Sequence, residues 1–152
     1  TESIMTTFTV YGLPATQGSK SIGFTKDGRA FLRESSARLT KFRKSIAASA
    51  LAAGIKPRKG EVGLRVHWTD TRPTSHLRKR TANGLAPNAP TRPGRYDQDK
   101  ILRAVCDALT GVAYADDRQV RAVACSCAYA DDQVVRVTVF DLQEEGEWTY
   151  ER

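Results

Sequence analysis

The segment Arg95-Tyr-Asp-Gln-Asp-Lys-Ile-Leu-Arg-Ala-Val-Cys-Asp-Ala-Leu-Thr-Gly-Val-Ala-Tyr-Ala-Asp-Asp-Arg118 carries the strongest structural signal in the chain. Its apolar side chains recur at helical spacing from about Gln98 to Thr110, and Gly111 follows where helices commonly end. The predicted buried face consists of Ile101, Leu102, Val105, Ala108 and Leu109. The segment also holds five aspartates, which are Asp97, Asp99, Asp107, Asp116 and Asp117. Carboxylates gathered in a basic chain that binds an anion need a positive partner, and a divalent cation is one.

The remaining periodicity predicts a second long helix and several strands. The helix is expected from Ser35 or Ser36 as N-cap to about Ala53, with Gly54 after it and an apolar stripe of Leu39, Phe42, Ile46, Ala50 and Ala53. Strands are expected at 8–11, 61–69, 119–129 and 133–142, the last two joined by a hairpin-like turn at Asp131-Asp132, with hairpin pieces near Phe24 and Phe31. We therefore predict one α+β domain over residues 1–152, with a mixed β-sheet and two principal helices.

The charge of the chain is unevenly distributed. Of its 152 residues, 40% are hydrophobic and 27% charged, which is typical of a globular domain. The net charge is +7, but residues 1–103 carry 20 Lys and Arg against 7 Asp and Glu, whereas residues 104–152 carry 4 against 10. One basic region and one acidic end favour nucleic acid as the partner. The alternative is that these charges are simply solvated, and this choice stays open for Arg38, Lys41, Arg43 and Lys44 on the first helix.

A long basic loop is predicted at residues 70–96. Four prolines interrupt the periodicity there, and a loop of this length in a compact domain is usually functional or disordered. We interpret it as a mobile arm that follows the phosphate backbone, with a flexible insertion as the alternative. Together with the basic segment after the first strand, it supplies the candidate DNA-binding residues Lys20, Lys26, Arg29, Arg33, Arg72, Arg78, Lys79, Arg80, Arg92 and Arg95. The acidic tail at 143–152 is predicted to be peripheral.

The cysteines and the hydropathy bear on the cellular context. Cys106, Cys125 and Cys127 are odd in number, lack CxxC spacing and have no histidine pair to complete a zinc site. We interpret them as core or near-core thiols of a reducing, cytoplasmic protein. No apolar run approaches the length of about 18 residues that a membrane span needs, and no signal peptide is visible. No membrane partner is therefore expected.

The aspartates fall into two pairs that flank the central helix. Asp97 and Asp99 precede it, and two residues apart in extended backbone their side chains point the same way. Asp116-Asp117 follows it and leads into a strand; if that strand lies beside the helix start, the two pairs converge on one or two divalent ions. Such ions would polarise a scissile phosphate and help generate hydroxide. Lys100 and Arg103 are the cations available to stabilise the transition state.

Each of these residues also has an ordinary structural interpretation. Asp97 could be only a helix N-cap, and Asp116-Asp117 only a turn. Asp99, Arg103 and Asp107 could be only a ladder of ion pairs at i, i+4 and i+8. Caps and such pairs are common, so each of these interpretations is more frequent than a metal ligand. All of them together beside a basic loop favour metal-assisted phosphodiester chemistry on nucleic acid.

Over about residues 7–141 the chain resembles the RusA family of Holliday junction resolvases of bacteria and their phages. The family signature reads roughly D-x-D-[N/K]-x-x-[K/R]-x-x-x-D-A-L, followed after a short link by D-D-x-Q-[V/I]. It is matched by Asp97-Gln-Asp99-Lys100-Ile-Leu-Arg103-Ala-Val-Cys-Asp107-Ala-Leu and by Asp116-Asp117-Arg-Gln119-Val120. The opening Val10-Tyr-Gly12-Leu-Pro14, the strand at 61–69 and the final strands also fit the family layout.

The resemblance implies a homodimeric, Mg²⁺-dependent endonuclease, with Mn²⁺ as a substitute and no small-molecule cofactor. Such an enzyme nicks two opposing strands of a four-way DNA junction during recombination and repair, in a bacterial or phage-infected cell. Carried over by residue, Asp97, Asp99 and Asp117 match the metal-binding carboxylates, and Asp116 is their neighbour. Two symmetric cuts also suit a twofold dimer, which supplies two identical sites.

The resemblance departs from the family pattern at two cations. Arg103 stands where better-known members have a catalytic lysine, and Lys100 stands where they have asparagine. Arginine does not lose its proton, but it can still stabilise transition-state charge, and Lys100 could substitute from one turn away. The alternative function is a non-catalytic branched-DNA-binding protein whose nuclease site has decayed, with Arg103 as the sign. A third reading is a metal nuclease that acts on other DNA or RNA structures.

Overall fold

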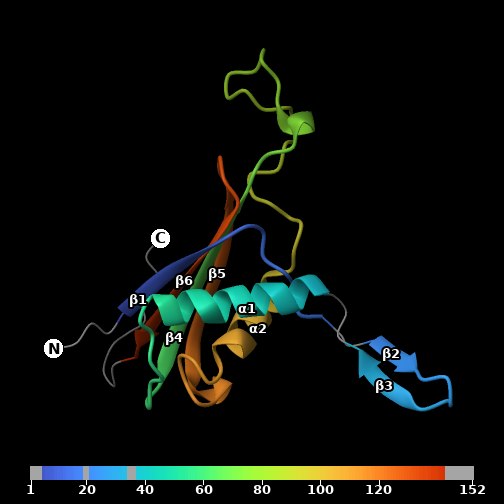
Figure 1. Ribbon diagram of the computed structural model, residues 1–152. Helices are drawn as coiled ribbons and strands as arrows, with labels where there is room; N and C mark the ends of the chain where they lie inside the picture. Colours follow the sequence, from blue (N-terminus) through green and yellow to red (C-terminus); the bar gives the residue numbers. More distant parts are fainter. Residues whose placement is uncertain (1–4, 19–20, 34–36, 143–152) are drawn as a thin grey trace.

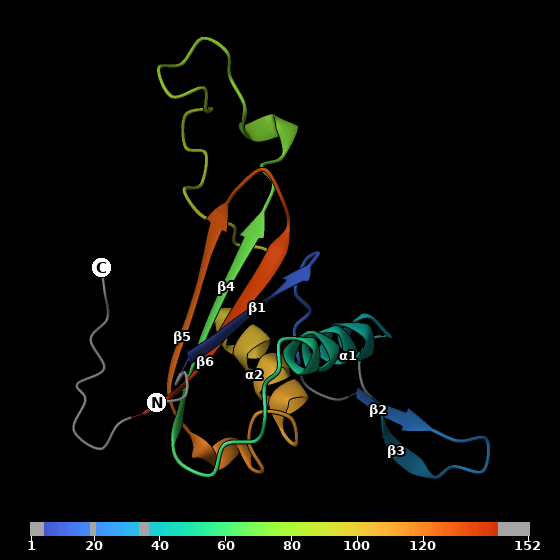
Figure 2. The same cartoon turned by 60° about the vertical axis from the view of Figure 1, so that its left-hand side comes forward.

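A four-stranded sheet with both long helices on one face forms the body of the protein (Figures 1 and 2). The computed structural model describes residues 5–18, 21–33 and 37–142. The strand order is β1-β6-β4-β5, with bounds β1 Met5–Tyr11, β4 Val62–Asp70, β5 Val120–Tyr129 and β6 Val134–Asp141. Strand β4 is parallel to β5 and antiparallel to β6, and β1 is antiparallel to β6. The predicted α+β fold with a mixed sheet is confirmed.

The two helices are α1 (Ala37–Ala52) and α2 (Gln98–Leu109), and they pack on each other and on the sheet. Both end as predicted, because Gly54 and Gly111 follow them with φ of 82° and 85°, a conformation that glycine adopts without strain. Helix α1 buries its predicted stripe except for Ala53, which is exposed. Helix α2 buries Ala104 in place of Leu102 and Ala108, which are half-buried. The predicted N-cap at Ser35 or Ser36 lies outside the described residues.

Strand side chains alternate between a covered and an uncovered face of the sheet. Leu64, Val66 and Trp68 of β4 are fully buried, as are Val135, Val137 and Val139 of β6, which lie opposite them in the register. The intervening residues face away from the helices, and among them Arg65 and Arg136 are exposed. Cys127 is buried, and Cys106 and Cys125 are half-buried free thiols, which confirms the prediction of core or near-core cysteines.

The predicted hairpin between the last two strands is wrong. Strands β5 and β6 follow each other in the chain, but β4 lies between them and pairs with both. The connection crosses the end of β4, where Ala130 N donates to Asp70 O at 2.9 Å and Thr69 Oγ1 donates to Asp132 O at 2.8 Å. The Asp131-Asp132 turn signal is therefore real, but it does not specify which strands pair. The apolar strand β4 occupies the centre because both of its edges can then form backbone hydrogen bonds.

Two segments extend from this body. The first, residues 71–96, runs beyond the end of the sheet (Figure 1), and we call it the arm. It is not without structure, because it contains a 3₁₀ turn, η1 (Thr74–His76), and a bridge between Leu77 and Leu85. The second is the hairpin of β2 (Ser21–Phe24) and β3 (Ala30–Arg33), which confirms the strand pieces predicted near Phe24 and Phe31.

Several expectations fall on parts of the chain that the structure does not describe. Lys20, the side chain of Arg33 and the acidic tail at 143–152 lie outside the described residues. Within the described ranges, no helix is both long enough and apolar enough to cross a membrane.

Candidate active site

The first acidic pair lies at the N-terminal end of α2, where the arm returns to the sheet. Asp97 occupies the N-cap position, with φ −74° and ψ 127°, but its side chain makes no capping hydrogen bond. Instead Asp97 Oδ2 pairs with Lys100 Nζ at 3.1 Å, and its side chain is 66% exposed. Asp99 lies in the first turn and is exposed. Asp97 therefore occupies the N-cap position without a side-chain capping bond, and its exposed carboxylate pairs with Lys100 instead.

Gln98, the residue between these aspartates, fixes the start of α2 to the sheet. Its Oε1 accepts hydrogen bonds from Trp68 Nε1 at 3.0 Å and from Cys125 Sγ at 2.8 Å, and its Nε2 donates to Cys127 Sγ at 3.1 Å. Burial raises the pKa of the Cys125 thiol to about 12, so this thiol keeps the proton that it donates. This role of Gln98 was not predicted from the sequence. The sequence signal that could have indicated it was Trp68, because a buried indole N–H needs a hydrogen-bond acceptor.

Asp70 is a second residue that the sequence analysis missed. It is 3% exposed at the end of β4, and its Oδ1 accepts from Thr71 N at 2.8 Å and from Gln133 Nε2 at 2.9 Å. Its Oδ2 pairs with Arg95 Nε at 3.3 Å. Asp70 directly precedes the arm and Arg95 lies two residues before Asp97, so this ion pair closes the base of the arm beside the first acidic pair.

Four of the arginines predicted to bind DNA hold the arm itself in place. Arg72 lies over the Tyr129 ring, 4.2 Å from its centroid, and donates to Pro90 O at 2.8 Å. Arg92 donates to Cys127 O at 2.7 Å, and Arg78 donates to Leu77 O at 2.7 Å. With Arg95 bound to Asp70, the exposed cations of the arm that make no such contact are Lys79 and Arg80. On the hairpin, Lys26 is exposed, and Arg29 is exposed while its Nε pairs with Asp27 Oδ2 at 3.3 Å.

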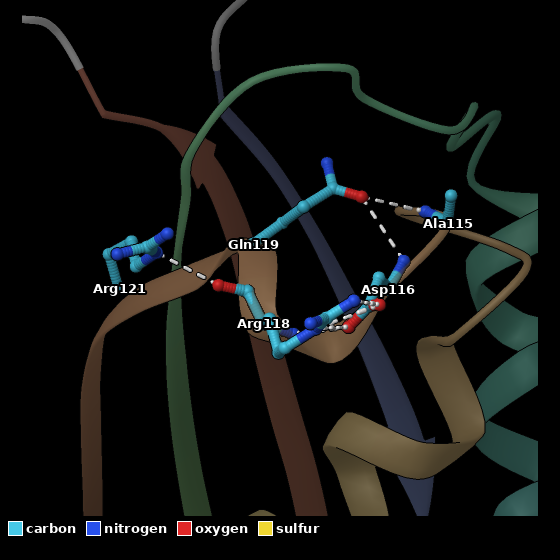
Figure 3. Close-up of polar contacts among 5 residues, drawn as sticks. All are labelled: Ala115, Asp116, Arg118, Gln119 and Arg121. Carbon is cyan, nitrogen blue, oxygen red and sulfur yellow. Dashed lines mark hydrogen bonds and ion pairs between the residues drawn. The ribbon is translucent and has the colours of Figure 1, made fainter.

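The second acidic pair lies just beyond the C-terminal end of α2 (Figure 3). Asp116 caps the 3₁₀ turn η2 (Asp117–Gln119) by accepting from Arg118 N at 2.8 Å. The Arg118 guanidinium also donates to both carboxylate oxygens of Asp116, at 2.7 to 3.1 Å. These hydrogen bonds hold the pKa of Asp116 at about 2, well below its ordinary value. Asp116 therefore has a structural role, whereas Asp117 is exposed beside it.

Gln119 joins this acidic turn to the segment before β4, and Figure 3 shows its contacts with the turn. Its Oε1 accepts from Ala115 N at 3.0 Å and from Asp116 N at 3.1 Å, and its Nε2 donates to Arg58 O at 2.8 Å and to Gly60 O at 3.0 Å. One side chain thus satisfies four backbone groups from two separate segments. Gln119 is part of the D-D-x-Q motif, but this role was not predicted from the sequence.

The predicted ladder along α2 does not form among the described residues. Asp107 accepts a hydrogen bond from Gln17 Nε2, in the segment that follows β1, and no ion pair joins it to Arg103. Arg103 is exposed, one helical turn after Asp99. Arg103 therefore keeps its charge available for a ligand.

The expected convergence of the two acidic pairs within one chain is also wrong. The pairs flank opposite ends of α2, and a helix of 12 residues is about 18 Å long. Across the described residues, no group of three or more His, Cys, Asp or Glu side chains lies close enough to hold a metal ion. The start of α2 lies near the C-terminal end of β4. Because β5 runs parallel to β4, the short link after α2 enters β5 at the opposite end of the sheet.

Comparison with known proteins agrees with this architecture. The family model for Endodeoxyribonuclease RusA matches residues 12–140, which include β4, β5, all of β6 except its last residue, both helices, the arm and both acidic pairs, but not β1. No curated protein matches the chain. RusA proteins are divalent-metal-dependent endodeoxyribonucleases that resolve Holliday junctions. On the strength of a match over most of its length, the chain belongs to the RusA family of endodeoxyribonucleases.

Proposed function

We propose that this protein is a homodimeric, Mg²⁺-dependent resolvase that makes paired symmetric nicks in four-way DNA junctions. The observation that carries the proposal is Asp97, an N-cap aspartate whose side chain does not cap its helix. Asp99 lies two residues later in the first turn, where the positive end of the helix dipole favours carboxylates and other anions. Both carboxylates are exposed at this helix start, where a ligand can reach them.

The residues present fit a divalent metal. Mg²⁺ takes oxygen ligands and is commonly held by one or two carboxylates together with substrate phosphates, and Asp97 and Asp99 offer such oxygens. When bound, the metal polarises the scissile phosphate and lowers the pKa of a water molecule. Mn²⁺ takes the same ligands. The pair Asp97–Asp99 is the part of this site that one chain provides at the start of α2.

Two cations of the same helix can stabilise the negative charge that develops on the phosphate. The Lys100 Nζ lies 3.1 Å from Asp97 Oδ2, so this lysine can orient the carboxylate and shift toward a bound phosphate. Arg103 is exposed one turn further along the helix. Because a guanidinium keeps its proton, Arg103 acts by electrostatic stabilisation and not as an acid or base.

Asp117 belongs to the proposed site, but it cannot join Asp97 and Asp99 within the same chain. The second chain of a homodimer can supply it, and twofold symmetry then creates two equivalent composite sites. Asp116 supports this arrangement indirectly, because its contacts with Arg118 set the turn that carries Asp117. Two such sites would cut two strands symmetrically.

The first test is cleavage of a labelled synthetic four-way junction with Mg²⁺ and with Mn²⁺, beside a linear duplex. We expect paired nicks confined to the junction, lost in Asp99→Asn and kept in the matched control Asp131→Asn, an exposed aspartate on the β5–β6 connection. Tight junction binding without nicks under either metal would contradict catalysis. That outcome would favour the branched-DNA-binding alternative. Arg103→Lys, which restores the family residue, would then be the first variant to test.

A second test separates a composite site from a site within one chain. Asp99→Asn and Asp117→Asn chains are co-expressed with different tags, and the mixed dimer is purified. If the sites are shared between chains, one site of the mixed dimer keeps all its aspartates and makes single nicks. If each site belongs to one chain, both sites carry a lesion and the mixed dimer is inactive.

A further inference from the structure

The β2–β3 hairpin is a well-formed element that exposes large apolar side chains. Its five-residue loop is closed by Thr25 N donating to Arg29 O at 2.9 Å and Gly28 N donating to Thr25 O at 2.9 Å, with Gly28 at φ 86°. Ile22 and Phe24 are 65% and 69% exposed. Because strand side chains alternate, these two residues share one face of the hairpin.

The opposite face of the hairpin carries Phe31, which is less exposed than Ile22 and Phe24, at 37%. Phe31 lies across from Gly23 in the register, and a Cβ on Gly23 would come within 2.6 Å of its ring. The glycine therefore allows Phe31 to lie flat against the hairpin backbone. On the other face Ile22 and Phe24 stay largely exposed, and the hairpin packs closely against no other described helix or strand. A two-stranded hairpin alone is marginally stable, so this face is expected to have a partner.

The charge around this face indicates what the partner is. From Lys20 to Arg33 the sequence has four basic residues and one acidic residue, Asp27. Lys26 and Arg29 lie on the exposed loop between the two strands. A second copy of the chain is itself basic, with a net charge of +7, and charged residues are depleted at the cores of protein interfaces. Aromatic side chains beside cations are instead the combination that binds unstacked nucleic acid bases.

We propose that the hairpin is a stacking wedge for the branch point of the DNA junction. Phe24, with Ile22 beside it, packs against the base face that is uncovered where the arms of the junction meet, and Lys26 and Arg29 contact the neighbouring phosphates. Apolar wedges commonly separate stacked bases in this way, and the cost is smallest where stacking is already interrupted. This inference rests on the proposed function, because it takes the four-way junction as the substrate.

The test uses the full chain in metal-free buffer with a junction that carries 2-aminopurine at the branch point. The wild-type protein is expected to change the fluorescence of this base but not of 2-aminopurine placed inside an arm. Phe24→Ala should remove that change and weaken junction binding by about five- to 150-fold, the range for loss of one stacked base. Phe24→Trp should keep both. Leu51→Ala, at an exposed leucine of α1, is the matched control and should behave as wild type.

Two outcomes would overturn the wedge. In one, Phe24→Ala binds the junction and changes its fluorescence as the wild type does. In the other, sedimentation shows that Phe24→Ala is a monomer where the wild type is a dimer, which assigns the face to a second copy. If the wild type nicks junctions and Phe24→Ala gives either of these two outcomes, the wedge fails and the proposed function stands. If the fluorescence change is present but no metal supports nicking, the proposed function fails and the wedge stands.

Discussion

Trp68 Nε1 donates a hydrogen bond to Gln98 Oε1 at 3.0 Å, and this contact ties the central strand to the residue between the two aspartates of the first acidic pair. Trp68 is fully buried, and Gln98 is the first residue of α2. The position of Asp97 and Asp99 therefore depends on a polar contact in the interior, and the exposed surface around them does not set it.

Gln98→Leu should destabilise the fold and impair nicking together. It leaves the buried indole N–H without an acceptor, which costs about 1–3 kcal/mol of unfolding free energy. Urea unfolding measures this loss, and junction cleavage measures the effect on kcat. Trp68→Phe removes the donor instead, so the double variant should cost less than the sum of the two single variants. Additive losses would show that the contact does not couple the two residues.

Arg118→Ala should raise the pKa of Asp116 from about 2 toward its ordinary value of 3.8. Because the folded pKa is depressed, Asp116 contributes stability above about pH 4, and this contribution is lost as the pH falls toward 2. The variant should therefore show a weaker loss of stability over that range. Carboxyl NMR titration checks the pKa directly. Arg121→Ala is the control, because Arg121 donates to Arg118 O and does not contact Asp116; an equal shift in this control would disprove the assignment.

Removing the free cations of the arm should reduce the salt dependence of junction binding. Lys79→Ala with Arg80→Ala deletes two predicted phosphate contacts, so the slope of log K against log salt should fall by about 1.8. Binding assays over a range of salt concentrations give the slope. Lys56→Ala with Lys59→Ala removes two exposed lysines near the other end of β4 and should change it little. An unchanged slope in the arm variant would exclude these two residues from the phosphate contacts.

Arg103→Ala should lower kcat for nicking by about 10² to 10³, the usual loss for one group that stabilises transition-state charge. Metal affinity should stay the same, because Arg103 is not a proposed metal ligand. Arg103→Lys should retain most of the activity, since it preserves the charge. Single-turnover cleavage over a range of Mg²⁺ concentrations separates the two effects. Equal activity of Arg103→Ala and wild type would indicate that Lys100, and not Arg103, stabilises the transition-state charge.

Sequence periodicity was sufficient for local structure. Helix α2 was predicted to within one residue because an amphipathic period and Gly111 agree on its bounds. The same kind of signal failed at Asp131-Asp132, because a turn motif reports a reversal of the chain and not the strand that lies between its two sides. Strand order depends on contacts distant in sequence, and no local pattern records them.

The site was predicted in its residue types but not in its arrangement. Asp97, Asp99 and Asp117 stood out because carboxylates are unusual in a basic chain, yet the length of α2 keeps the two pairs apart. Gln98, Asp70 and Gln119 were missed because glutamine and aspartate look like ordinary surface residues in a sequence. Burial against Trp68, the base of the arm and the segment at 58–60 gives them their roles, and burial is set by the tertiary fold.

The parallel pairing of β4 with β5 has a consequence for how the protein folds and varies. These strands can meet only after the chain closes a loop over residues 71–119, so formation of the sheet centre is limited by a slow, non-local search. The entropy of closing a long loop changes by only about 0.6 kcal/mol when its length doubles. The arm can therefore lengthen or shorten by many residues with little effect on stability, provided that Asp70 and Arg95 still meet at its base. A change in the length of the outer arm therefore leaves undisturbed the sheet against which the start of α2 is fixed.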